Sequence, residues 1–161
     1  MGETNVTRNW VIRSTPFADS QARARTHAVA METTIRLLLV GADPRVRRGV
    51  SMRLASESDM AVVGEACDSP TAMSACAALG PCVVVLDLGV RDANGCISLN
   101  QLRELAQSNR VVVLSLDHDP RLRQLTEQAG AAALVDKLGD PDHLLAAIRT
   151  VAAETNWNQR M

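Results

Sequence analysis

Residues 82–87, Cys-Val-Val-Val-Leu-Asp, form a short apolar run that ends on a carboxylate. Two later runs have the same form: residues 111–115, Val-Val-Val-Leu-Ser, end on a hydroxyl, and residues 131–137, Ala-Ala-Ala-Leu-Val-Asp-Lys, end on an ammonium group. Apolar runs of this length are typical of buried strands in a parallel sheet. We therefore expect three strands that bring Asp87, Ser115 and Lys137 to one edge of a sheet.

Lys137 is the only lysine of the chain, and the other members of its 17 Lys and Arg residues are arginines. An ammonium group is a compact point charge with three donors, whereas a guanidinium group is a planar fork. A lysine at a strand end therefore indicates a site that needs a compact cation. The alternative is that one lysine stands there by chance in an arginine-rich composition.

From residue 34 onward, short apolar runs alternate with amphipathic stretches, which is the pattern of βαβ units around a parallel sheet. Four of the amphipathic stretches begin with an aspartate that has a proline one or two residues later, which predicts a helix N-cap. These aspartates are Asp43, Asp68, Asp119 and Asp140. The expected strands are residues 35–40, 60–65, 82–87, 110–115 and 131–137. We predict the α/β class, with a doubly wound five-stranded parallel sheet and five helices in (βα)5 order.

The 161 residues are 47% hydrophobic, which suffices for one domain with its own core. We expect this domain at residues 34–153, followed by a C-terminal tail at residues 154–161. Residues 1–33 contain several arginines but no apolar core of signal-peptide length, and we expect them to be disordered. Met31 lies just before the first strand and is a candidate alternative start, so the N-terminal extension need not be translated.

Composition argues against several classes of function. A formal net charge of −1 gives no basis for bulk binding to nucleic acid, and no apolar run is long enough to span a membrane. The four cysteines, at positions 67, 76, 82 and 96, have neither C-x-x-C spacing nor histidines beside them. They predict no zinc or redox site, and we interpret them as small buried residues in a reducing cytoplasm.

Taken together, five segments resemble the receiver domains of two-component response regulators, in particular the subfamily found in front of LuxR-type helix-turn-helix domains. The resemblance covers residues 34–153, and no single segment would be specific alone. The segments are residues 35–40 (IRLLLV), 62–66 (VVGEA), 84–88 (VVLDL), 111–115 (VVVLS) and 129–132 (AGAA). This resemblance implies a flavodoxin-like (βα)5 fold and a role in phosphorelay signalling without enzymatic activity.

The resemblance also implies roles for the residues at the sheet edge. Asp87 falls at the phospho-acceptor position, Ser115 at the hydroxyl that hydrogen-bonds the phosphoryl oxygen, and Lys137 at the cation that pairs with both. The backbone carbonyl of Gly89 falls where the family supplies a magnesium ligand.

The first strand departs from the family, which normally places two adjacent carboxylates after it to hold magnesium. Gly41 and Ala42 stand there and offer no side-chain ligand. Because magnesium requires near-octahedral oxygen ligation, we expect weak or absent metal binding and slow or absent phosphorylation of Asp87. Asp43 follows directly, but its place before Pro44 favours an N-cap role over a ligand role.

The switch residues differ as well. The family's aromatic switch residue corresponds to Leu134, and the proline often found after the acceptor corresponds to Arg91, so coupling by ring rotation is not expected. Leu134, flanked by Arg121 and Arg123, is a candidate interaction surface. The alternative is a solvated helix face that has no partner.

Three roles remain open for the retained residues. Asp87 and Lys137 could form an ion pair that locks the site, Asp87 could still accept a phosphoryl group, or the residues could be relics. Because the chain ends at Met161, where the subfamily would continue into a DNA-binding domain, we expect a stand-alone regulator. Its partner would be another protein, such as a histidine kinase, or a second copy.

Three other functions are weighed against this hypothesis. One is a conventional phospho-accepting receiver whose helix-turn-helix domain is missing. A phosphatase of the haloacid-dehalogenase type would need its nucleophile after the first strand and a second aspartate two residues later. Here Asp87 follows the third strand, and the residue two positions later is Gly89. Dinucleotide binding would need a G-x-G-x-x-G loop, which residues 40–43 (VGAD) lack.

Overall fold

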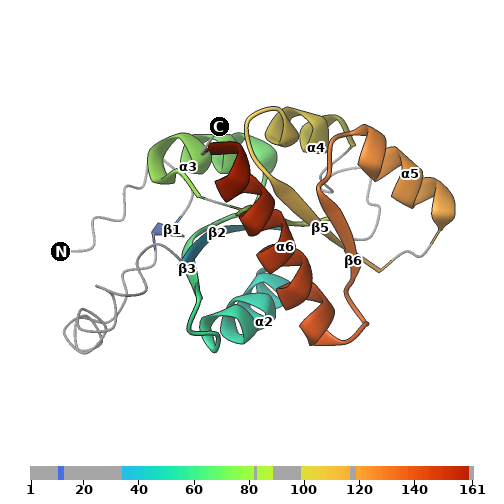
Figure 1. Ribbon diagram of the computed structural model, residues 1–161. Helices are drawn as coiled ribbons and strands as arrows, with labels where there is room; N and C mark the ends of the chain where they lie inside the picture. Colours follow the sequence, from blue (N-terminus) through green and yellow to red (C-terminus); the bar gives the residue numbers. More distant parts are fainter. Residues whose placement is uncertain (1–10, 13–33, 82, 89–98, 117–118, 160–161) are drawn as a thin grey trace, which may run out of the picture.

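The computed structural model describes residues 11–12, 34–81, 83–88, 99–116 and 119–159 (Figure 1). The expectations for Met31, Cys82, Gly89, Arg91 and Cys96 fall outside these ranges. The strands are β1 (Val11–Ile12), β2 (Ile35–Val40), β3 (Met60–Ala66), β4 (Val83–Asp87), β5 (Val111–Ser115) and β6 (Ala133–Asp136). The helices are α2 (Pro44–Ala55), α3 (Ser69–Leu79), α4 (Leu99–Ala106), α5 (Pro120–Gln128) and α6 (Pro141–Gln159).

All strands belong to one sheet in the order β1-β3-β2-β4-β5-β6. The five strands from β2 to β6 are parallel, and β1 pairs with β3 in the antiparallel direction. The predicted five-stranded parallel sheet with five helices is therefore confirmed. Since every parallel strand points the same way, the residues at the ends of β2, β4, β5 and β6 meet at one edge.

The helices cover the sheet on both faces, and each face has its own apolar core (Figure 1). On one face, Leu54 of α2 and Ile148 of α6 pack against alternate residues of the central strands, such as Leu37 and Val85. On the other face, α3, α4 and the end of α5 pack against the intervening residues. Because both faces are covered, β4 and β5 are buried throughout and read as continuous apolar runs.

The predicted N-cap bonds are present at all four aspartates. The side chain of Asp140 accepts from the backbone N–H of Asp142 at 3.0 Å at the start of α6. The side chains of Asp43, Asp68 and Asp119 accept hydrogen bonds from the backbone N–H groups of Arg45, Thr71 and Arg121, each at 2.9 Å. These bonds satisfy donors that have no partner within the helix. The bonds from Thr71 hold the pKa of the Asp68 carboxyl below its usual value.

Three features differ from the sequence-based expectations. Val11–Ile12 form a strand within the segment expected to be disordered, because the outer edge of β3 offers them backbone partners. Helix α6 continues to Gln159, past residue 153 where the domain was expected to end. Cys67 is exposed rather than buried because it follows the last residue of β3, whereas Cys76 is half-buried and its pKa is raised by burial to about 11.

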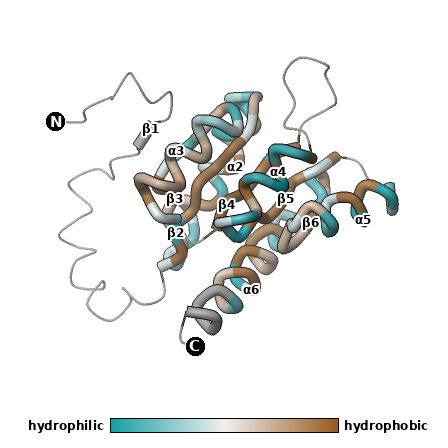
Figure 2. Tube along the Cα trace, turned by 90° about the horizontal axis from the view of Figure 1, so that it is seen from above, coloured by the Kyte–Doolittle hydropathy of each residue, from teal (hydrophilic) through white to brown (hydrophobic). Residues whose placement is uncertain are grey.

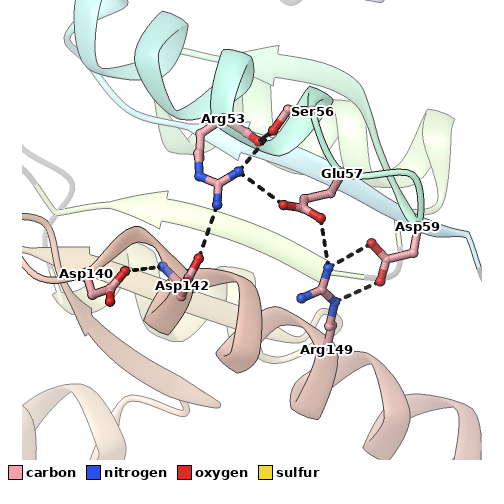
Figure 3. Close-up of polar contacts among 7 residues, drawn as sticks. All are labelled: Arg53, Ser56, Glu57, Asp59, Asp140, Asp142 and Arg149. Carbon is pink, nitrogen blue, oxygen red and sulfur yellow. Dashed lines mark hydrogen bonds and ion pairs between the residues drawn. The ribbon is translucent and has the colours of Figure 1, made fainter.

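A cluster of charged side chains joins α6 to the end of α2 and the start of β3 (Figure 3). Arg149 of α6 donates to Asp59 at 2.8 and 3.0 Å and to Glu57 at 3.2 Å. Arg53 of α2 donates to Glu57 at 3.1 Å and to Asp142 at 3.2 Å. The Arg149 guanidinium lowers the pKa of the Asp59 carboxyl, and the two carboxylates raise the pKa of Arg149.

None of the helices in the described ranges combines the length and the apolar composition that crossing a membrane requires. Figure 2 shows that apolar residues of the helices alternate with polar ones, as in amphipathic helices that cover a sheet.

Candidate functional site

The carboxyl edge of the sheet brings together the three polar residues that end the apolar runs. Asp87 is the last residue of β4, Ser115 is the last residue of β5, and Lys137 directly follows β6. The backbone fixes their spacing, because Asp87 lies opposite Leu114 in the sheet and the Lys137 N–H donates to the Ser115 carbonyl at 2.9 Å. The predicted meeting of Asp87, Ser115 and Lys137 at one edge is thus present.

Asp87 and Lys137 form a direct ion pair between carboxylate Oδ1 and ammonium Nζ. The side chain of Asp87 is 7% exposed and that of Lys137 is 12% exposed, so both charges lie largely out of water. The Ser115 residue is also buried. A buried charge is stable only with a partner nearby, and each of these two residues supplies the partner of the other.

Gly41, which follows β2, lies against Asp87. Its N–H donates to the Ala66 carbonyl at 3.0 Å, which extends the β2–β3 pairing by one residue. A Cβ atom added to Gly41 would lie 2.9 Å from Cβ of Asp87, which is closer than real Cβ atoms approach their neighbours. The absence of a side chain at position 41 therefore allows the end of β2 and Asp87 to come together.

Arg47 of α2 contacts Gly41 and Glu65 next to the functional site. The sequence did not predict these contacts. One guanidinium nitrogen, Nη1, donates to the Gly41 carbonyl oxygen, and Nε lies 3.7 Å from Oε1 of Glu65. The Arg47 side chain lines a small, mainly apolar cavity together with Asp87, Val46 and Val85. A permanent positive charge thus stands at the end of β2, where the family places acidic side chains.

The described residues do not fit a magnesium ion. No three His, Cys, Asp or Glu side chains in the described ranges come together as a metal-binding group. Asp87 is already paired with Lys137, Ala42 is exposed but has no ligand atom, and Asp43 caps α2 as predicted. One carboxylate held by a lysine does not supply the octahedral oxygen ligation that magnesium requires.

The expected interaction surface is only partly exposed. Leu134 is half-buried in β6 and packs against the core beneath α4 and α5, whereas Arg121 and Arg123 of α5 are exposed. Packing against the core thus accounts for the apolar side chain at position 134. Exposed apolar side chains instead directly follow the site residues: Leu116 after Ser115 is 42% exposed, and Leu138 after Lys137 is 80% exposed.

Comparison with known proteins identifies the fold and the family. A model of the response regulator receiver domain matches residues 37–149, which is most of the chain. The chain belongs to the response regulator receiver domain family. The matched range contains Asp87, Ser115 and Lys137, so these residues lie in the receiver domain proper.

Two curated relatives illustrate the relationship of this receiver domain. The nitrate/nitrite response regulator protein NarL of Escherichia coli strain K12 is 32% identical over 117 residues, which are 73% of this chain and 54% of that protein. The transcriptional regulatory protein UhpA of Salmonella typhimurium is 33% identical over 107 residues, which are 66% of this chain and 53% of that protein. The chain thus spans about half the length of the curated relatives it matches.

Among solved structures, the receiver domain is similar to a LuxR-family two-component response regulator from Aurantimonas sp. SI85-9A1. The TM-score is 0.67 and the sequence identity is 28%, with 75% of this chain and 86% of that chain covered. The receiver domain of CheB from Thermotoga maritima, at 23% identity and a TM-score of 0.64, shares the fold.

Proposed function

We propose that this receiver domain is atypical and acts in cytoplasmic signal transduction by contact with another protein, with weak or absent magnesium-dependent phosphorylation of Asp87. The observation that carries this proposal is the lack of a side-chain metal ligand at Gly41 and Ala42, next to the ion pair of Asp87 and Lys137. Asp87 thus has a cation of the same chain as its partner and no acid at these two positions with which to share a metal ion. The partner would be a histidine kinase, a downstream protein or a second copy.

The charge balance of the site supports a fixed conformation. With Gly41 and Ala42 in place of two acids, Lys137 is the cation paired with Asp87, and Arg47 lines the same small cavity as Asp87. Phosphoryl transfer to a carboxylate normally depends on a metal ion to bridge the oxygens of donor and acceptor. A site that does not favour this ion would hold its conformation whether or not a phosphodonor is present.

The alternative is a conventional phospho-accepting receiver, which is favoured by the retained Ser115 and Lys137 at the strand ends. Neither hypothesis makes the chain an enzyme. The phosphatase alternative gains no support, because Asp87 ends the third parallel strand along the chain rather than the first.

Intact-mass measurement after incubation with acetyl phosphate and magnesium tests the proposal. We expect no gain, or a slow gain, of one phosphoryl group over a time in which a typical receiver is fully modified. Asp87→Asn is the matched control, because it keeps the size of the side chain and removes the nucleophile. A prompt gain that Asp87→Asn abolishes would contradict the proposal and support the conventional receiver.

Sedimentation velocity in the same mixtures gives a second test. A protein that acts through a fixed surface should show the same sedimentation coefficient with and without the phosphodonor. A phosphodonor-dependent dimer would contradict the fixed conformation.

A further inference from the structure

Arg47 has the most buried side chain among the arginines of α2. It is 19% exposed, whereas the side chain of Arg53 is 37% exposed. Arg45 and Arg48 are exposed on the same helix. Arg47 instead lines the small cavity between α2 and the sheet that Asp87 also lines. Because a guanidinium stays charged in folded proteins, this positive charge is a permanent part of the space beside Asp87.

The contacts of Arg47 are those of a charged group and not only of a space-filling one. Nη1 donates to the carbonyl oxygen of Gly41, and Nε lies 3.7 Å from Oε1 of Glu65, whose side chain is 15% exposed. Nε is buried and has no hydrogen-bond partner among the described residues. A methionine would fill the same space without a buried donor to satisfy, so packing alone does not account for an arginine at this position.

Gly41 supplies the backbone oxygen to which Arg47 donates. The residue follows β2, and its N–H continues the pairing with β3 through the Ala66 carbonyl. Backbone carbonyl oxygens are among the ligands that hard divalent cations bind. Because Arg47 donates to the Gly41 oxygen, this ligand atom at the end of β2 already has a cation as its partner.

Two separate features therefore disfavour a divalent cation beside Asp87. Gly41 and Ala42 offer no side-chain ligands, which lowers the number of oxygens. The Arg47 charge raises the electrostatic cost of placing another cation nearby, and in a partly buried site this cost is screened less than at the surface. The second effect would persist even if side-chain ligands were restored.

We infer that Arg47 is a specificity-determining residue of this site, whose guanidinium excludes divalent cations from the space beside Asp87. The inference rests on the proposed function, in which the receiver domain works without magnesium. It assigns part of that property to a residue outside the two positions where the acids are missing. A carboxylate restored at position 42 therefore gives only part of the cation affinity that the site can reach.

The test compares variants of the full chain that all carry Ala42→Asp, because this exposed position can supply a carboxylate. Manganese(II) is the probe, since it suits oxygen ligands as magnesium does and its free ion is counted by electron paramagnetic resonance. Addition of Arg47→Gln should tighten manganese binding by about tenfold relative to Ala42→Asp alone. Glutamine can still donate to the Gly41 carbonyl, so this variant removes the charge and keeps a donor.

Three further variants in the same background separate charge from structure, and circular dichroism shows whether each is folded. Arg47→Met has neither charge nor donor and should tighten binding as much as Arg47→Gln, so it decides the question if Arg47→Gln does not fold. Arg47→Lys keeps a positive charge and should bind manganese as weakly as Ala42→Asp alone. Arg48→Gln, the matched control, removes a charge from an exposed position of the same helix and should change the affinity by less than about twofold.

Equal manganese affinity with and without the Arg47 charge would overturn the inference. An equal gain in Arg47→Lys would also overturn it, as would a gain in Arg47→Met that a folded Arg47→Gln does not share, because the hydrogen bond to Gly41 would then be the cause. The unchanged protein is titrated in parallel. Tight binding by the unchanged protein would contradict the proposed function, whereas weak binding there with no gain in the Arg47 variants would contradict only the role of Arg47.

Discussion

At the scale of single residues, the ion pair between Asp87 and Lys137 determines what the functional site can do. Both side chains are nearly buried, and each neutralises the other. Removal of one partner leaves a charge in a place that water reaches poorly, which in fully buried pairs costs about 3–5 kcal/mol. Loss of either partner alone should therefore lower the stability of the fold as well as change the chemistry of the site.

We expect Lys137→Met to lower the free energy of unfolding by about 2 kcal/mol, because the site lies at the sheet edge where Asp87 can regain some water. Urea denaturation of the two single variants and the double variant Asp87→Asn with Lys137→Met measures the coupling. The double variant should lose less than the sum of the single losses. Strictly additive losses would show that the two charges do not depend on each other.

Restoration of acids at positions 41 and 42 should have unequal effects. Ala42 is exposed, so Ala42→Asp should change stability by less than about 0.5 kcal/mol and should add a magnesium ligand. Gly41→Asp should cost about 1–3 kcal/mol, because its Cβ would lie 2.9 Å from Cβ of Asp87.

Thermal unfolding and calorimetric titration with magnesium distinguish these two variants. We expect Ala42→Asp to bind magnesium more tightly than the unchanged protein does. The two proteins should have similar melting temperatures. Equal stability of Gly41→Asp and Ala42→Asp would show that Asp87 moves aside easily.

At the scale of secondary-structure elements, the charged cluster around Arg149 fixes the last helix. It joins α6 to the end of α2 and to the residue before β3, which are distant in the sequence. The contacts are partly exposed, so their strength is limited by water and by dissolved salt.

We expect Arg149→Met to lower the free energy of unfolding by roughly 1 kcal/mol or less at neutral pH and low salt. Because Arg149 lowers the pKa of Asp59, the contribution of this pair is present above the ordinary pKa of an aspartate. It is lost as the pH falls through the lowered pKa.

Urea denaturation of the unchanged and variant proteins between neutral pH and pH about 3 measures this dependence. The difference between the two proteins should become smaller as the solution is made more acidic. Arg123→Met, on the exposed face of α5, is the matched control and should show no such trend. A difference that stays constant with pH would contradict the role given to Asp59.

At the scale of the whole molecule, ligand binding must appear as a change in stability. A ligand that binds the folded state raises the free energy of unfolding by an amount that grows with its concentration relative to Kd. If the site does not favour magnesium, millimolar magnesium should shift Tm by less than about 1 °C beyond the effect of equal ionic strength. A saturable rise of several degrees would contradict the proposed function.

The fold and the principal site residues were accessible from the sequence because they depend on local patterns. Apolar runs that end on Asp87, Ser115 and Lys137 predict both the strands and the edge where they meet. The capping aspartates predict helix starts for the same reason, since an N-cap depends only on its own first turn.

Features that depend on distant contacts were not accessible in this way. The hydrogen bond from Arg47 to Gly41 requires the position of α2 over the end of β2. The half-buried state of Leu134 depends on how α5 covers β6, and the pairing of Val11–Ile12 depends on an open edge of β3. None of these arrangements leaves a periodic signal in the sequence.

The close approach of Gly41 to Asp87 makes the two neighbouring positions unequal for the engineering of a metal site. Position 42 is exposed and can carry a new side chain at the surface. A side chain at position 41 would require the backbone or the Asp87 side chain to move. An engineered acidic pair at the end of β2 therefore has to be designed together with the conformation of Asp87, and not as two independent substitutions.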